Sequence, residues 1–99
     1  MPHAERQQYI ATLRDFPDRL EARVRPLTAD QLEQRTAPSE WCTRQIVHHL
    51  ADSHMSAVFR FKLPLTQDEP AFPTYDQEAW ALLADYDLPL EVSFMILRG

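Results

Sequence analysis

The sequence predicts an all-α fold, a helical bundle, and three observations support this prediction. Apolar residues recur three and four positions apart over long stretches, which is typical of amphipathic helices. Period-two alternation, the pattern of half-buried strands, is absent. The sequence holds a single glycine, so tight β-hairpin turns lack the residue they most often need. With 99 residues, the chain forms one domain at most.

The first predicted helix runs from Ala4 to about Val24. Pro17 lies inside it, and because proline lacks an amide proton and clashes with the preceding turn, we expect a kink there or a restart at Asp18. A short helical turn is predicted over Thr28–Gln34, which opens with the Thr-x-x-Gln pattern of a capping box. The apolar positions that define the first helix are Tyr9, Ile10, Leu13, Phe16, Leu20 and Val24.

The longest helical pattern extends from Trp41 to Lys62, and we expect this segment to be the centre of the fold. Thr43 is its predicted N-cap. Its apolar residues form a broad arc on one side of the helix, which must be buried against other helices. The arc consists of Ile46, Val47, Leu50, Ala51, His54, Ala57, Val58 and Phe61.

An irregular loop is predicted after Lys62, because prolines and acids follow one another there. A second Thr-x-x-Gln pattern predicts a helix from Thr74 through about Asp85. Leu88-Pro89 is a typical helix start, and the residues that follow are strongly apolar. Since a helix of about ten residues is marginal alone, this last segment needs a partner surface.

Composition excludes several classes of protein. The formal net charge is −5 and the basic residues are scattered among acids, which argues against a nucleic-acid binder. One cysteine cannot form an internal disulfide and fits a reducing compartment. No apolar run approaches the roughly 20 residues of a membrane span, and the N-terminus lacks the apolar core of a signal peptide. We therefore expect a cytoplasmic protein with neither nucleic-acid nor membrane partners.

Three histidines on the central helix form the one cluster that suggests chemistry. His48 and His49 are adjacent, and His54 lies five residues beyond His49, so no two share a helix face and a metal ion could be held by only one of them. His49 lies at the edge of the apolar arc and is a candidate metal ligand; the alternative is a boundary histidine bonded to a backbone carbonyl. We expect His54 to be structural, inside the arc, and His48 to be solvated.

Other polar and aromatic residues give weaker signals. Cys42 shares a face with His49 and could supply a thiolate ligand, although a small buried cysteine is commoner. The acids near the histidines and tryptophans are interpreted as surface or capping groups, and the tryptophans as core anchors: Asp52 (near Arg44), Asp76 (beside Tyr75), Trp41 and Trp80. Neither a glycine-rich phosphate loop nor a Ser-His-Asp arrangement is present, so no catalytic residue is assigned.

The residues from Trp41 to His54 also carry a resemblance. They read Trp-x-x-Arg-Gln-Ile-Val-His-His-Leu-Ala-Asp-Ser-His, and Arg60-Phe61-Lys62-Leu63, Tyr75-Asp76 and Ala79-Trp80 follow. This pattern resembles the DinB/YfiT-like family, to which metal-dependent hydrolase activity is ascribed. The resemblance implies an up-down-down-up four-helix bundle, usually dimeric, with a divalent metal, nickel or zinc, held by three histidines.

The resemblance places the first of those ligands at His49, eight residues after the tryptophan. The other two form a His-x-x-x-His pair on a later helix, and this chain has no histidine after His54. We therefore expect the N-terminal portion of a family member, with 88–99 as the start of the third bundle helix and no activity of the 99 residues alone.

The full-length form would be a metal-dependent hydrolase or a thiol transferase acting on a small molecule. Asp52 would contact a ligand of the metal rather than the metal itself. Because half a bundle leaves apolar faces uncovered, we expect the chain to associate with itself, as a dimer. The alternative function is a non-catalytic helical association module in which His49 is structural.

Overall fold

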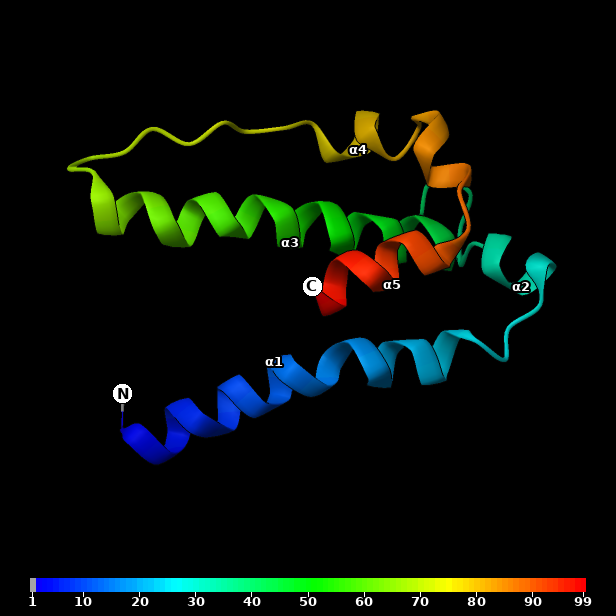
Figure 1. Ribbon diagram of the computed structural model, residues 1–99. Coiled ribbons are helices and arrows are strands. Elements are labelled where there is room, and N and C mark those ends of the chain that lie inside the picture. The colour runs from blue at the N-terminus through cyan, green and yellow to red at the C-terminus, as the bar shows by residue number, and fades with distance from the viewer. Residues whose placement is uncertain (1) are drawn as a thin grey trace.

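The computed structural model describes residues 2–99, and every regular element in that range is helical. The elements are α1 (His3–Val24), α2 (Ala29–Glu33), α3 (Thr43–Thr66), α4 (Gln77–Trp80), the 3-10 turn η1 (Ala84–Asp87) and α5 (Leu90–Arg98) (Figure 1). The predicted all-α class is confirmed. None of these helices combines the length and the apolar character that a membrane span requires.

The helices follow an up-down-down order. In Figure 1, α1 runs in one direction, whereas α3 and α5 both run in the other. Parallel neighbours cannot be joined by a short loop, and residues 67–89 return alongside α3 as a long crossover that includes α4 and η1 (Figure 1). This arrangement is part of the predicted up-down-down-up four-helix bundle.

The core lies where α5 packs against the two long helices, α1 and α3. Val24 of α1, Val47 of α3 and Phe94 of α5 are buried together, and three partly buried leucines pack around them, namely Leu20, Leu32 and Leu90. The main packing of α5 is against α3, with a smaller contact to α1. The predicted need of the C-terminal apolar segment for a partner surface is thereby met.

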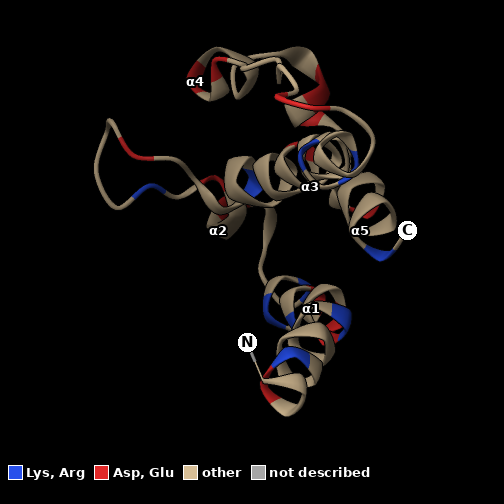
Figure 2. Ribbon diagram, turned by 90° about the vertical axis from the view of Figure 1, so that its left-hand side faces the viewer, with Lys and Arg blue, Asp and Glu red and all other residues tan. Residues whose placement is uncertain are grey.

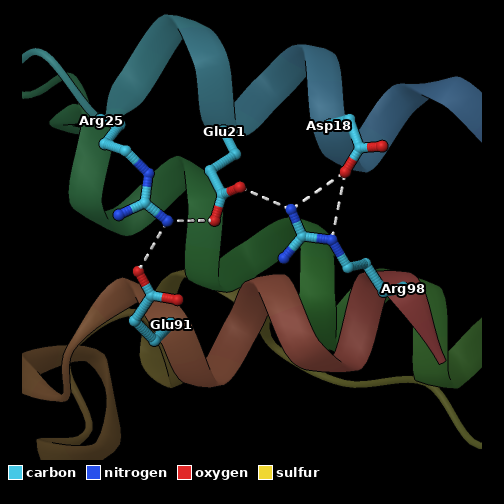
Figure 3. A network of polar contacts seen from close by, with 5 residues as sticks. All are labelled: Asp18, Glu21, Arg25, Glu91 and Arg98. Carbon is cyan, nitrogen blue, oxygen red and sulfur yellow. Dashed lines mark hydrogen bonds and ion pairs between the residues drawn. The ribbon is translucent and has the colours of Figure 1, made fainter.

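Ion pairs join α1 to α5 beside this core (Figure 3). Arg98 Nη2 donates to Glu21 Oε2 at 2.6 Å and to Asp18 Oδ1 at 3.0 Å. Arg25 Nη2 donates to Glu21 Oε1 at 2.5 Å and to Glu91 Oε1 at 3.1 Å. Since Glu21 accepts from both guanidinium groups, the hydrogen bond from Arg98 and then that from Arg25 hold the pKa of its carboxyl below the usual range.

Two helices continue through prolines where the sequence pattern predicts an interruption. α1 is a single helix with Pro17 inside it, so the restart at Asp18 does not occur. α3 continues past Lys62 and Pro64 to Thr66, where the predicted loop would already have begun. A proline removes only one amide from the helical ladder, and the neighbouring bonds persist; for example, the Gln67 amide donates to the Leu63 carbonyl at 2.9 Å.

The buried face of α3 is rotated relative to the predicted arc. Val47 and Ala51 are buried as expected, but Ile46 and Val58 are 45% and 48% exposed. His48 is buried and His54 is exposed, so the predictions for both histidines are wrong. The reason is that α5 and the crossover pack on the side of His48, whereas much of the apolar side is left uncovered by residues 2–99.

Capping also differs from the prediction at two helix starts. Cys42, not Thr43, is the N-cap of α3. Asp76 caps α4, where its Oδ1 accepts from the Ala79 amide at 3.1 Å, and the predicted helix over 74–85 is reduced to α4 followed by η1. At α2 the predicted capping box of Thr28 and Gln31 is confirmed.

Candidate metal-ligand site around His49

His49 lies in the second turn of α3 and is half-buried. Its Nδ1 atom is buried and has no hydrogen-bond partner among the described residues. The alternative of a histidine bonded to a backbone carbonyl through this nitrogen is therefore not observed. An unsatisfied buried polar atom costs about 1–3 kcal/mol of folding free energy. A hydrogen-bond or metal partner for this nitrogen would recover that free energy, and residues 2–99 do not provide one.

Trp41 fixes the His49 ring from one side. The two rings meet edge to face, with 5.0 Å between their centroids and 70° between their planes. The indole Nε1 of Trp41 in turn donates to Glu78 Oε2 in α4 at 2.9 Å. Trp41 is half-buried, so it positions the imidazole more than it anchors the core.

The N-terminus of α3 is held by a buried glutamine, Gln45, which was not among the residues predicted from the sequence. Gln45 Oε1 accepts from the Cys42 amide at 3.1 Å and from Arg35 Nη1 at 2.8 Å, and its Nε2 donates to the Ala81 carbonyl at 3.5 Å. Cys42 is a free, buried thiol beside it, as the commoner of its two interpretations predicts. The available signal was Cys42-x-x-Gln45, the same spacing as the capping pattern that opens α2.

His48 ties α3 to the last helix. Its Nε2 lies 2.9 Å from the Leu88 carbonyl oxygen, and its Nδ1 lies 2.6 Å from Ser93 Oγ. A carbonyl only accepts, so Nε2 carries the proton and Nδ1 accepts from the Ser93 hydroxyl. Burial lowers the pKa of His48 and favours this neutral form. With both nitrogens engaged, His48 is structural and offers no lone pair to a metal.

Asp52 follows His49 by one helical turn and bonds elsewhere. Its Oδ2 accepts from the Tyr86 hydroxyl at 2.7 Å, and burial, followed by this bond, raises the pKa of Tyr86 well above its usual value. The nearby Arg44 forms an ion pair with Glu33 of α2. Asp52 therefore joins α3 to η1, and its predicted contact with a ligand of the metal remains a hypothesis.

Among the described side chains that could bind a metal, one is placed to do so. Within residues 2–99 no three His, Cys, Asp or Glu side chains gather closely enough to hold an ion. His48 is engaged on both sides and His54 is exposed, whereas His49 has a buried nitrogen without a partner. His49 is thus the histidine of α3 that suits a metal, and the further ligands would lie outside the described residues.

Comparison with known proteins identifies the family to which the chain is similar. The model of the DinB superfamily matches residues 12–94. Proteins of Oceanobacillus iheyensis and Geobacillus thermodenitrificans, both named "Putative metal-dependent hydrolase", are 40% and 42% identical to the chain over 93% and 94% of its length. These matches span 54% and 53% of the two relatives, so the chain spans about half the length of the relatives it matches.

A solved structure shows the same architecture. YfiT from Bacillus subtilis superposes on 99% of this chain with a TM-score of 0.91 and 36% sequence identity, over 57% of its own chain. That protein is described as "a probable metal-dependent hydrolase with an unusual four-helix bundle topology". By sequence and by fold, the chain belongs to the DinB superfamily.

Proposed function

We propose that this chain contributes His49 to the divalent metal centre of a metal-dependent hydrolase. The observation that carries the proposal is the buried, unpartnered Nδ1 of His49. The names of the relatives, which refer to metal-dependent hydrolysis, support it. Nickel or zinc is the proposed metal, because imidazole nitrogen suits both ions.

An ion held there by His49 would polarise a substrate oxygen or lower the pKa of a water or a thiol. The chain's own residues position the ligand: Trp41 fixes the His49 ring, and Glu78 fixes Trp41. Thiol transfer to a small molecule is a second reaction that the same centre would support. A cytoplasmic location, which the single cysteine favours, belongs to the same proposal.

The ligand set is completed from outside this chain. A catalytic zinc site typically has three protein ligands, and these 99 residues supply one. The others come from a second copy of the chain or from residues beyond these 99. The isolated chain is accordingly proposed to be inactive, and a homodimer is its proposed assembly.

Metal retention tests the proposal. The purified chain is stripped with a chelator, dialysed against one equivalent of nickel or zinc, and analysed for metal content and for mass in solution. We expect an oligomer that retains metal, a His49→Ala variant that loses it, and a His54→Ala variant that retains it. His54 is the matched control because it lies on the same helix and is exposed.

Equal metal retention by the three proteins would contradict the role of His49. A wild-type oligomer that retains no metal would exclude a second copy of the chain as the source of the other ligands. Association that the His49→Ala substitution leaves unchanged would favour the alternative function, a helical association module. That alternative rests on a specific observation, the large apolar side chains left exposed on α1 and α3, among them Leu13 at 72% and Phe61 at 75%. It predicts association that is independent of both metal and His49.

A further inference from the structure

A cavity lies between α3 and the crossover. The side chains that line this cavity, of about 250 Å³, come mainly from α3 and from the extended segment that precedes α4. Figure 1 shows these two stretches of backbone running alongside each other. A cavity of about 150 Å³ can hold benzene, so this one suits a molecule of one or two rings. The side chains that define its character are Asp52, Phe59, Arg60, Phe72, Tyr75 and Trp80.

The aromatic wall is not explained by core packing. The Tyr75 and Trp80 rings stack with 4.2 Å between their centroids and 30° between their planes. Trp80 remains 39% exposed and Phe59 remains 59% exposed, although both line the cavity. The predicted role of Trp80 as a core anchor is therefore wrong. Exposed aromatic faces of this kind attract flat rings and cations.

The charge at one end of the cavity is negative. The Tyr86 hydroxyl donates a hydrogen bond to Oδ2 of Asp52. The other carboxylate oxygen, Oδ1, can therefore accept a hydrogen bond from a ligand. The crossover adds to this negative charge, because residues 67–89 hold six acids and neither lysine nor arginine. Figure 2 shows red but no blue on the ribbon of α4.

One cation, Arg60, lies among the described lining residues. Its guanidinium carbon lies 5.6 Å from the centroid of the Phe72 ring, a cation–π contact. Arg60 follows Asp52 by eight residues on α3, a separation of about 12 Å along a helix. The positive group is thus engaged with an aromatic ring at one end of the cavity, and the carboxylate lies at the other.

We propose that this cavity binds a small organic cation, a protonated amine carried on an aromatic ring. The ring lies among Phe72, Tyr75 and Trp80, and the ammonium group donates to Asp52. The site does not depend on a metal at His49, because none of its contacts involves that residue. It adds a ligand class to the chain whether or not the proposed metal centre is correct.

Binding of benzylamine tests the proposal. The probe is titrated into metal-free protein while the two indole N–H signals, from Trp41 and Trp80, are followed by NMR; the spectrum of a Trp80→Phe variant assigns them. We expect a saturable shift of the Trp80 signal, with about a tenfold preference for benzylamine over benzyl alcohol, its neutral isostere. The same preference is expected in His49→Ala, which separates this site from the metal proposal.

The Asp52→Asn variant removes the charge but keeps an oxygen that can accept from Tyr86, so the fold should survive. We expect it to lose the preference for the amine, whereas Asp68→Asn, which neutralises an acid of the crossover outside the cavity, keeps it. If Asp52→Asn does not fold, loss of benzylamine binding in Trp80→Leu, followed by the line width of the benzylamine signals themselves, is the second readout. Equal binding of amine and alcohol by the wild type, or tighter binding of phenylacetate, would overturn the proposal.

Discussion

Glu21 is the carboxylate on which the contact between α1 and α5 converges. It accepts hydrogen bonds from Arg98 and from Arg25, so its charged form is stabilised only in the folded chain (Figure 3). The folded pKa is therefore lower than the ordinary value of 4.5 that applies to the unfolded chain. As the pH falls, the unfolded state therefore binds more protons than the folded state, and the free energy of unfolding decreases.

The stabilisation from Glu21 is thus complete above pH 4.5 and is lost as the pH falls through the lowered pKa of the folded state. We expect the Glu21→Gln variant to melt below the wild type at pH 7 and the difference to shrink steadily below pH 4.5. Melting followed by circular dichroism measures this. Glu5→Gln, an exposed position near the start of α1, is the control with little effect at either pH; a Glu21→Gln difference that is unchanged in acid would contradict the assignment.

Single residues also show where sequence reasoning stops. The position of His49 at a core edge followed from helical geometry, but the roles of His48 and His54 were reversed. The bonding partners of His48 lie 45 and 40 residues away, at Ser93 and Leu88, and no local pattern encodes them. Periodicity shows that a helix has an apolar side, but it does not show which side of the helix the rest of the chain covers.

At the scale of elements, α5 carries more of the core than its length suggests. It has nine residues, and Phe94 at its centre is 3% exposed against Val24 and Val47. Because truncation there leaves a cavity in the middle of three helices, we expect Phe94→Ala to lower the free energy of unfolding by about 3–5 kcal/mol. Urea denaturation measures this. Met95→Ala, at a position 70% exposed, should change it by less than about 0.5 kcal/mol, and similar losses in both variants would argue against this packing.

The two Thr-x-x-Gln patterns show why element boundaries are only partly predictable. At Thr28 the pattern forms the expected capping box. At Thr74 it does not, because Asp76 lies two residues farther on and accepts the capping bond itself. Both residue types are good N-caps, and the choice between them depends on how the crossover packs on α3.

For the molecule as a whole, the uncovered apolar surface is the dominant feature. α1 and α3 separate toward the N-terminal end of α1 (Figure 1), and large apolar side chains remain exposed on both, including Tyr9, Leu13, Phe61 and Leu65. We expect concentration-dependent self-association in sedimentation experiments, shifted toward monomer by Leu65→Lys. Leu82→Lys, equally exposed but on the crossover, is the control. A compact monomer at every concentration would contradict this prediction.

The helical class followed from composition and periodicity, which report local preference. The parallel course of α3 and α5 did not, since nothing in residues 67–89 specifies the direction in which the chain returns; that expectation came from the resemblance. The cavity beside Trp80 was missed for the same reason, because Asp52 and Trp80 are brought together only by the crossover.

The crossover also bears on how the chain folds during synthesis. Val47 is made 47 residues before Phe94, the residue that completes its core. At about 5–20 residues per second, the apolar face of α3 at Val47 stays without that partner for roughly 2–9 s during synthesis, and that of α1 for longer. We therefore expect chaperones that shield apolar helices to bind the newly made protein. Its yield in a cell should depend on these chaperones more than is usual for a chain of this length.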